Sequence, residues 1–301
     1  MEVEKRLSRL EPCLARLVYT SDLHGNVNLY RAAGEAAVRT RADALIFGGD
    51  LCPGKPSGTS PRMPIEQTEF IHYRLSPLLS DWKRAHPPLR IFAIPGNDDC
   101  QTVLPALEEL EKNGLIENLH RETRILGDYT LMGLSYVPPT PFHLKDFERW
   151  DAGPVGVSST YSYRCVMGTL RGFKVIDDFK SHLDSLPSIA QELHRFHVKD
   201  PAHTVAVIHT PPFGTRCDVL FDGRHIGSKA LRSWIEKNQP RMALHGHIHE
   251  SPKLSGTFFD RLGSTTVINP GCDQTRPHLV FIDLDNLAEI EHSIYGKMAV
   301  R

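Results

Sequence analysis

The chain has 301 residues, of which 40% are hydrophobic and 24% charged, so its length and composition suit a globular protein with a substantial core. Its formal net charge of −1 excludes an overall basic field that would collect nucleic acid. The first twenty residues carry too many charges for a signal peptide, and no apolar run approaches the roughly 18 residues of a membrane span. We therefore expect a cytoplasmic protein with no membrane partner, and six scattered cysteines that stay reduced.

Short apolar segments typical of buried strands recur along the chain, with helix-like segments between them. In chain order, we expect strands at Arg16–Thr20, Ala44–Phe47, Leu89–Ile94, Tyr129–Leu134, Val205–Ile208, Met242–Leu244, Thr266–Ile268 and Leu279–Ile282. Helices are expected at Leu29–Thr40, Ile65–Arg84, Val103–Lys112, Phe179–His197 and Ser228–Asn238. This alternation predicts an α/β fold in which helices cover the faces of a sheet.

Two segments interrupt the alternation within what we interpret as a single domain over residues 1–301. Residues 52–64 are rich in Pro, Gly and Ser, which predicts a flexible loop. Residues 137–176 are too long for a plain connection, which predicts a lid or cap over the site. The aromatic residues Phe142, Phe147 and Trp150 in this excursion either contact an organic leaving group or only anchor the excursion to the domain.

Side chains that bind metals follow five of the predicted strands. The segments are Asp22-Leu23-His24, Gly49-Asp50, Gly96-Asn97-Asp98, the single residue His209, and Gly246-His247-Ile248-His249. Open α/β sheets place their sites at the carboxyl ends of strands, so these segments are expected to converge. In extended backbone, residues i and i+2 point the same way, so each His/Asp or His/His pair would share one face. Imidazole, carboxylate and amide donors without thiolates suit Mn, Fe, Zn or Ni.

In this order, the five segments resemble the signature of the calcineurin-like metallophosphoesterase superfamily, which runs DxH, GD, GN(H/D), H and GHxH. The resemblance covers about Arg16 to Asp283. It implies two mixed β-sheets packed as a sandwich and flanked by helices, a four-layer α/β fold. It also implies that Asp22, His24 and His249 hold one metal ion, that Asn97, His209 and His247 hold another, and that Asp50 bridges both.

The activity implied by the resemblance is hydrolysis of a phosphomonoester or phosphodiester by a hydroxide that bridges two divalent metal ions. Manganese is the expected metal, with iron, zinc or nickel as alternatives. One competing hypothesis is a non-catalytic scaffold that uses the same fold to bind proteins, but ligand types at all seven positions argue against it. Another is a nuclease, which the neutral charge disfavours. The substrate and the oligomeric state stay open.

One position departs from the commonest family pattern. Many members have histidine after the asparagine, whereas this chain has Asp98. An aspartate beside two cations should stay ionised, which makes it a poor proton donor and favours a role in orienting a ligand or water. Asp98 nevertheless counts among the candidate catalytic residues. Arg224 and His225, in a loop after His209, either contact substrate or are solvated.

Overall fold

The structure is a computed structural model that describes residues 15–54, 60–153 and 164–300. Positions 55–59 of the predicted flexible loop at 52–64 therefore lie outside the described residues. Within the described part of that range, Cys52 is a buried loop residue, and Met63 and Pro64 belong to a helix. Proline suits the first turn of a helix, where its missing N–H costs no hydrogen bond.

The described strands form two large mixed sheets and one hairpin. The first sheet has the order β15 (Gly296–Ala299), β14 (Glu289–His292), β13 (Val280–Asp283), β1 (Arg16–Thr20), β2 (Ala44–Phe47), β3 (Arg90–Ala93) and β4 (Glu117–Asn118). The second has the order β11 (Phe259–Leu262), β12 (Thr265–Ile268), β10 (Met242–Leu244), β9 (Thr204–Ile208), β6 (Tyr129–Leu134) and β5 (Thr123–Leu126). The hairpin pairs β7 (Val166–Thr169) with β8 (Gly172–Val175).

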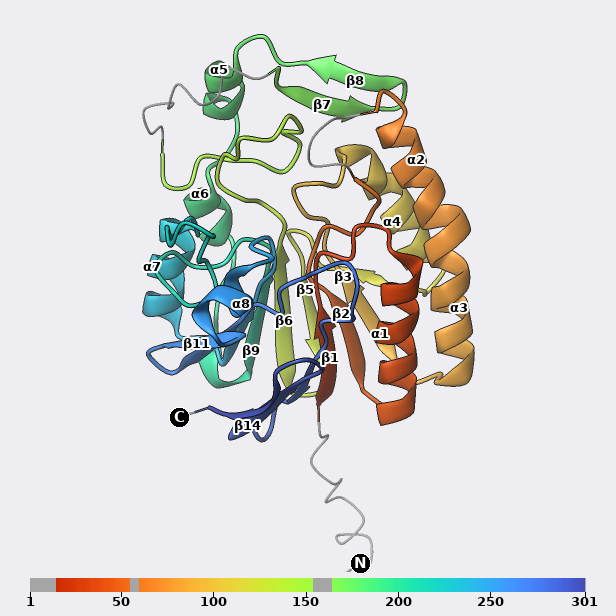
Figure 1. Cartoon of the computed structure of the whole chain (residues 1–301), viewed down its shortest axis with the longest axis vertical. Helices are drawn as coiled ribbons and strands as arrows, with labels where there is room; N and C mark the ends of the chain where they lie inside the picture. The colour runs from red at the N-terminus through yellow and green to blue at the C-terminus, as the bar shows by residue number, and fades with distance from the viewer. Residues whose placement is uncertain (1–14, 55–59, 154–163, 301) are drawn as a thin grey trace, which may run out of the picture.

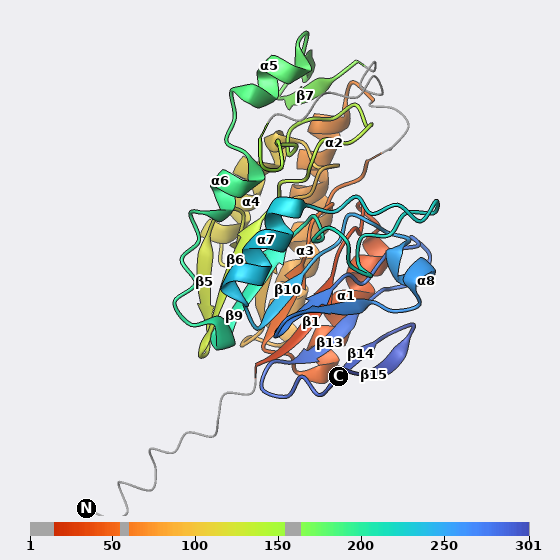
Figure 2. The ribbon, with the colours of Figure 1, turned by 90° about the vertical axis from the view of Figure 1, so that its left-hand side faces the viewer.

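Helices lie on the outer faces of the two sheets (Figures 1 and 2). Those beside the first sheet are α1 (Val27–Thr40), α2 (Met63–Phe70), α3 (Ser76–Ala85) and α4 (Leu104–Lys112), and those on the other side include α6 (Ile189–Leu193) and α7 (Lys229–Asn238). Two further short helices are α5 (Phe179–Asp184) and α8 (Ser251–Ser255). A π-helical turn, Ile71–Leu75, joins α2 to α3, so the helix predicted at Ile65–Arg84 is continuous but widened ahead of Pro77.

The two sheets pack face to face through fully buried side chains. Tyr19 and Phe92 of the first sheet belong to the same apolar cluster as Leu131 and Val207 of the second. Separate clusters join the outer face of each sheet to its helices. The order is therefore helices, sheet, sheet, helices, which confirms the four-layer α/β fold expected from the sequence.

Helices α1 and α3 touch at Gly34, where a side chain would have no room. A Cβ atom at this position would lie 1.9 Å from Cε2 of the Trp82 indole. We expect Gly34→Ala to lower the free energy of unfolding by about 1–3 kcal/mol, because overpacking forces the indole or a helix to move. Urea denaturation measures this loss. Glu35→Ala, on the exposed face of the same helix, is the control, and equal stability of the two variants would contradict the prediction.

The single helix expected at Phe179–His197 is wrong, because two short helices occupy this range. Asp178 caps α5 by accepting a hydrogen bond from Ser181 N, at 3.0 Å. Ser188 then caps α6 in a reciprocal capping box with Gln191. Two N-caps ten residues apart start two helices, and Pro187 prevents the first from continuing into the second.

The described part of the excursion at 137–176 is packed rather than loose. Phe147 and Trp150 are buried, and Trp150 Nε1 donates to Asp184 Oδ1 at 2.8 Å, which favours the anchoring interpretation for these two aromatics. Asp146 joins the excursion to the segment after the Asn97 motif, because its Oδ2 accepts from Gln101 N at 3.0 Å. The lid function itself stays a prediction.

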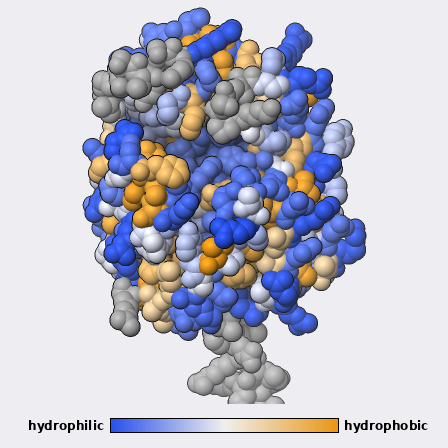
Figure 3. Space-filling view, viewed as in Figure 1, coloured by the Kyte–Doolittle hydropathy of each residue, from blue (hydrophilic) through white to orange (hydrophobic). Residues whose placement is uncertain are grey.

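The described residues contain no helix long and apolar enough to cross a membrane. Hydrophilic side chains cover most of the face shown in Figure 3, with hydrophobic side chains in separate patches. All five cysteines in the described ranges are free thiols, as expected, and Cys13 lies outside those ranges.

Candidate metal centre

The candidate ligands follow the carboxyl ends of strands that run parallel within each sheet. Asp22, Asp50 and Asn97 come after β1, β2 and β3, which are adjacent in the first sheet. His209 and His247 come after β9 and β10, which are adjacent in the second. Because the sheets pack face to face, the strand ends of both meet at one edge of the sandwich (Figure 1).

Four of the donors occupy one small volume. One ligand atom from each of Asp22, His24, Asp50 and His249 lies within 4.8 Å of the other three. His249 Nε2 lies 3.2 Å from Asp22 Oδ1 and 3.2 Å from His24 Nε2. Imidazole nitrogens and carboxylate oxygens this close together fit a single divalent transition-metal ion or zinc.

Asp50 connects this group to the remaining donors. Its Oδ2 atom lies 3.9 Å from His24 Nε2 on one side and 3.5 Å from His209 Nε2 on the other. His209 Nε2 also lies 3.1 Å from Asn97 Oδ1, and the centroid of its ring is 5.4 Å from that of His247. The structure thus brings all seven sequence-predicted ligands together, with Asp50 in the middle.

The backbone geometry expected for the ligand pairs is wrong. Asp22, His24, Asp50 and His247 all have positive φ angles, of 60°, 43°, 50° and 66°, so the chain turns sharply instead of continuing as extended strand. Such angles are rare for residues other than glycine and cluster at functional sites, where surrounding structure holds them. The turns explain why His247 lies against His209 while His249 lies against Asp22, although extended backbone would have aimed both rings the same way.

Buried carboxylates dominate the electrostatics of the site. Burial lowers the pKa of His209, but the Asp50 and Asp22 carboxylates together outweigh it and raise that pKa to about 10. Burial is likewise outweighed at His249, where Asp22 raises the pKa to about 9. Burial lowers the pKa of His247 to about 3. Protons on His209 and His249 thus compensate the carboxylates, and divalent cations would displace them on binding.

Asp98 lies beside this cluster. Its Oδ1 accepts a hydrogen bond from Asn97 Nδ2 at 2.9 Å, and its Oδ2 lies 3.7 Å from His24 Nδ1. Among the protein groups alone, burial and the Asp50 carboxylate raise the pKa of Asp98 to about 8. Two cations would act in the opposite direction, so the ionised, orienting Asp98 stays a prediction.

Two residues that organise the site were not identified from the sequence. The first is Asn269, whose Asn-Pro-Gly segment looks like an ordinary turn. Its Nδ2 atom donates to Gly246 O at 3.2 Å and Ile248 O at 3.0 Å, so it shapes the loop that carries His247 and His249. The only feature of the sequence that could have indicated this role is the position of Asn269 at the end of a predicted strand.

The second is Asp99, which is fully buried. Its carboxylate accepts hydrogen bonds from Leu51 N, Cys52 N and Gly96 N, at 2.9, 2.8 and 2.8 Å. Asp99 therefore ties the loop after Asp50 to the loop that carries Asn97. The sequence does show a second aspartate directly after the Asn-Asp pair. It could not show the role of this residue, because two of its three partners are 47 and 48 residues away in the chain.

In the loop after β9, Arg224 is exposed, whereas His225 is held by a buried carboxylate. Arg224 Nε donates to Asp222 Oδ2 at 2.6 Å, and both side chains are exposed, which fits the solvated alternative. His225 Nδ1 lies 2.7 Å from the buried Asp218 carboxylate. His225 is thus held in place, while a contact with substrate stays open.

Comparison with known proteins supports the fold. The TT1561 protein of Thermus thermophilus has a TM-score of 0.57 and 16% identity, over 96% of this chain and 100% of that chain. A dimetal phosphatase from Danio rerio also matches, with a TM-score of 0.49 and 11% identity over 96% of this chain and 97% of that chain, a similarity too low to add to this support. None of the curated proteins compared with the sequence is a significant match.

The family comparison covers all of the candidate ligands. The family model of calcineurin-like phosphoesterases matches residues 15–251, a span that begins at β1 and ends just after His249. All seven candidate ligands fall inside it. This chain therefore belongs to the calcineurin-like phosphoesterase family.

Proposed function

We propose that the chain hydrolyses a phosphomonoester or phosphodiester with the help of two divalent metal ions. The observation that carries the proposal is the convergence of donors on Asp50, whose Oδ2 atom lies within 4 Å of imidazoles from two different ligand groups. A carboxylate between two sets of ligands is the arrangement that a two-ion site requires.

The donor set fits such ions. Asp22, Asp50, Asn97 and His209 are all at most 4% exposed, so their polar atoms have little access to water and need partners. The donors are nitrogen and oxygen, which suit Mn, Fe, Zn or Ni, and we propose Mn as the ion used. When bound, such ions polarise a phosphoryl oxygen and bring the pKa of water close to neutrality.

The protein groups orient the donors. His209 Nδ1 lies 2.9 Å from Gly48 O, so in the neutral ring the proton sits on Nδ1 and the lone pair of Nε2 faces the cluster. Asp98 N donates to Asp50 Oδ1 at 2.8 Å, which leaves Oδ2 between the two histidines. We propose that the Asp98 carboxylate, next to Asn97 Nδ2 and His24 Nδ1, orients water or substrate rather than donating a proton.

Removal and return of metal tests the proposal. We expect protein stripped by a chelator to retain under 1% of its activity on p-nitrophenyl phosphate or bis(p-nitrophenyl) phosphate, because no described side chain replaces the charge of the ions. Adding Mn²⁺, Fe²⁺, Zn²⁺ or Ni²⁺ one at a time should restore activity as two ions bind per chain, measured by elemental analysis. Full activity of the stripped protein would contradict the proposal, and inactivity towards both esters with two ions bound would favour the scaffold hypothesis.

A further inference from the structure

A cavity of about 510 Å³ opens directly beside the metal cluster. Its wall includes His249, which is also one of the four clustered donors, together with Phe221, Lys253, Arg276, Ile294 and Tyr295. This volume is in the range of pockets that bind small organic molecules. A molecule held by the cluster could therefore extend past His249 into the cavity.

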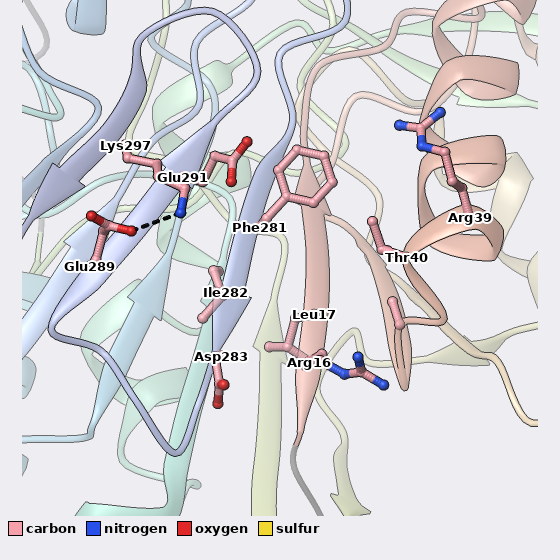
Figure 4. A pocket seen from close by; sticks show the side chains of 11 residues that line it. Arg16, Leu17, Arg39, Thr40, Phe281, Ile282, Asp283, Glu289, Glu291 and Lys297 are labelled. Atoms are coloured by element: carbon pink, nitrogen blue, oxygen red, sulfur yellow. Dashed lines mark ion pairs between the residues drawn. The ribbon is translucent and has the colours of Figure 1, made fainter.

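Two other cavities in the described residues include no candidate ligand. One of about 740 Å³ lies between α6 and α7. Another, of about 410 Å³, is shown in Figure 4 and lies at the opposite end of β1 from Asp22, where Arg16 and Asp283 line it. Neither could hold part of a molecule bound at the candidate ligands, whereas the cavity at His249 is lined by one of them.

One wall of this cavity is the tip of the loop after β9. Phe221 is 75% exposed there, so its ring is accessible to a ligand in the cavity. The loop is nevertheless held firmly, because the fully buried Asp218 accepts hydrogen bonds from Gly214 N at 3.0 Å and Gly227 N at 2.9 Å. The Leu220 amide also donates to the Arg224 carbonyl across the tip, at 2.9 Å.

A second aromatic side chain lies on the turn between β14 and β15. The Tyr295 ring stacks on Phe258, with an interplanar angle of 23°, and lies 4.8 Å from the His292 ring. His292 Nδ1 accepts a hydrogen bond from Ile294 N at 3.0 Å, which fixes the turn. The Tyr295 ring and the backbone of the Phe221 loop are therefore held in place before a ligand binds, which lowers the cost of ordering them.

The two basic side chains Lys253 and Arg276 that line the cavity are matched in number by two carboxylates, Glu250 and Asp273. Arg276 is bound to Asp273 through two hydrogen bonds, of 3.0 and 2.7 Å, which neutralises both. The side chains of Lys253 and Glu250 have no hydrogen bond or ion pair with any residue that the structure describes, and they carry opposite charges. They are free to pair with a donor and an acceptor on a ligand. An uncharged ligand suits this balance better than a second phosphate does.

We propose that this cavity binds the alcohol portion of the phosphate ester as an uncharged, planar aromatic group held between Phe221 and Tyr295. The inference rests on the proposed function, because it places the phosphoryl group at the metal cluster. Lys253, Arg276 and Tyr295 lie beyond residue 251, where the match to the family model ends.

The first test compares two esters whose leaving groups are both primary alcohols, 2-naphthylmethyl phosphate and ethyl phosphate, and their methyl diesters. With Mn²⁺-loaded protein, Phe221→Ala should raise KM for the naphthylmethyl ester about tenfold, as expected for a lost aromatic contact, and change KM for the ethyl ester less than twofold. Tyr295→Ala should act in the same direction. Tyr73→Ala removes a 74% exposed aromatic elsewhere, and it should change neither KM.

Equal KM changes for both esters, or none, would overturn the proposal. A second measurement does not need turnover: calorimetry with 2-naphthylmethanol and with adenosine should show binding to the metal-loaded protein that Phe221→Ala weakens about tenfold. Binding of only one of these two alcohols identifies the aromatic class, and binding of neither overturns the proposal. If calorimetry shows this binding but no ester is hydrolysed, the cavity is correct and the proposed hydrolytic function is wrong.

Discussion

Asp50→Asn should abolish phosphate-ester hydrolysis and reduce the bound metal to less than two ions per chain. Asp50 Oδ2 lies between His24 Nε2 and His209 Nε2, at 3.9 and 3.5 Å, so one negative charge serves both ligand groups. Asparagine keeps the shape of the side chain but removes that charge. Since metal-assisted charge stabilisation contributes several kcal/mol, we expect kcat/KM to fall by about 10³-fold or more.

Steady-state kinetics and elemental analysis of the same preparation measure both effects. Asp128→Asn, at an exposed position between β5 and β6, makes the same chemical change away from the cluster and should leave rate and metal content unchanged. Circular dichroism should show that both variants fold. If the Asp50→Asn protein binds two ions and keeps the wild-type rate, the proposed bridging role of Asp50 is wrong.

Gly246→Ala should lower kcat/KM by about 100-fold and weaken metal binding, although alanine brings no charge and no polar atom. A Cβ atom at Gly246 would lie 2.0 Å from Ser21 Oγ and 2.3 Å from Asp22 Oδ2. Ser21 and Asp22 are at most 1% exposed, so neither has free space to move into. The added methyl group must therefore displace Asp22 from His249, and a displacement of about 1 Å in a catalytic site costs on the order of 10²-fold in rate.

Gly54→Ala is the matched control, because its Cβ atom would come no closer than 3.7 Å to Asp98, an ordinary contact. It also lies near the cluster, so it tests whether any added methyl group there is harmful. We expect it to keep wild-type kinetics and metal content. If both variants lose the same activity and metal content, the short distances from the added Cβ atom at Gly246 do not explain the loss.

The central strands were predicted well because their signal is local. The bounds of β1, β2, β6 and β10 match the predicted ones, since each is a short apolar run. The edge strands β5 and β15 were missed, because their side chains are largely exposed and their sequences carry no apolar run. The inner strand β14 was missed too, because only alternate side chains are buried. Pairing with a neighbour, rather than local composition, makes them strands.

The sequence by itself determined the kinds of candidate metal ligand, their order and their positions after strands, and these were enough to indicate the family. It did so because each ligand motif is short and follows a recognisable apolar run. It also left the single-domain organisation and the lid at 137–176 as predictions.

Only the tertiary structure decided how these parts meet. The positive φ angles at Asp22 and His247 depend on contacts with the opposite sheet, such as the hydrogen bond from His247 N to Asp22 Oδ1 at 3.0 Å. The cavity between Phe221 and Tyr295 joins residues 74 positions apart in the chain, as their numbers show. Local sequence patterns report burial along one element, whereas strained turns and cavities arise where separate elements pack, so they become visible only in the folded chain.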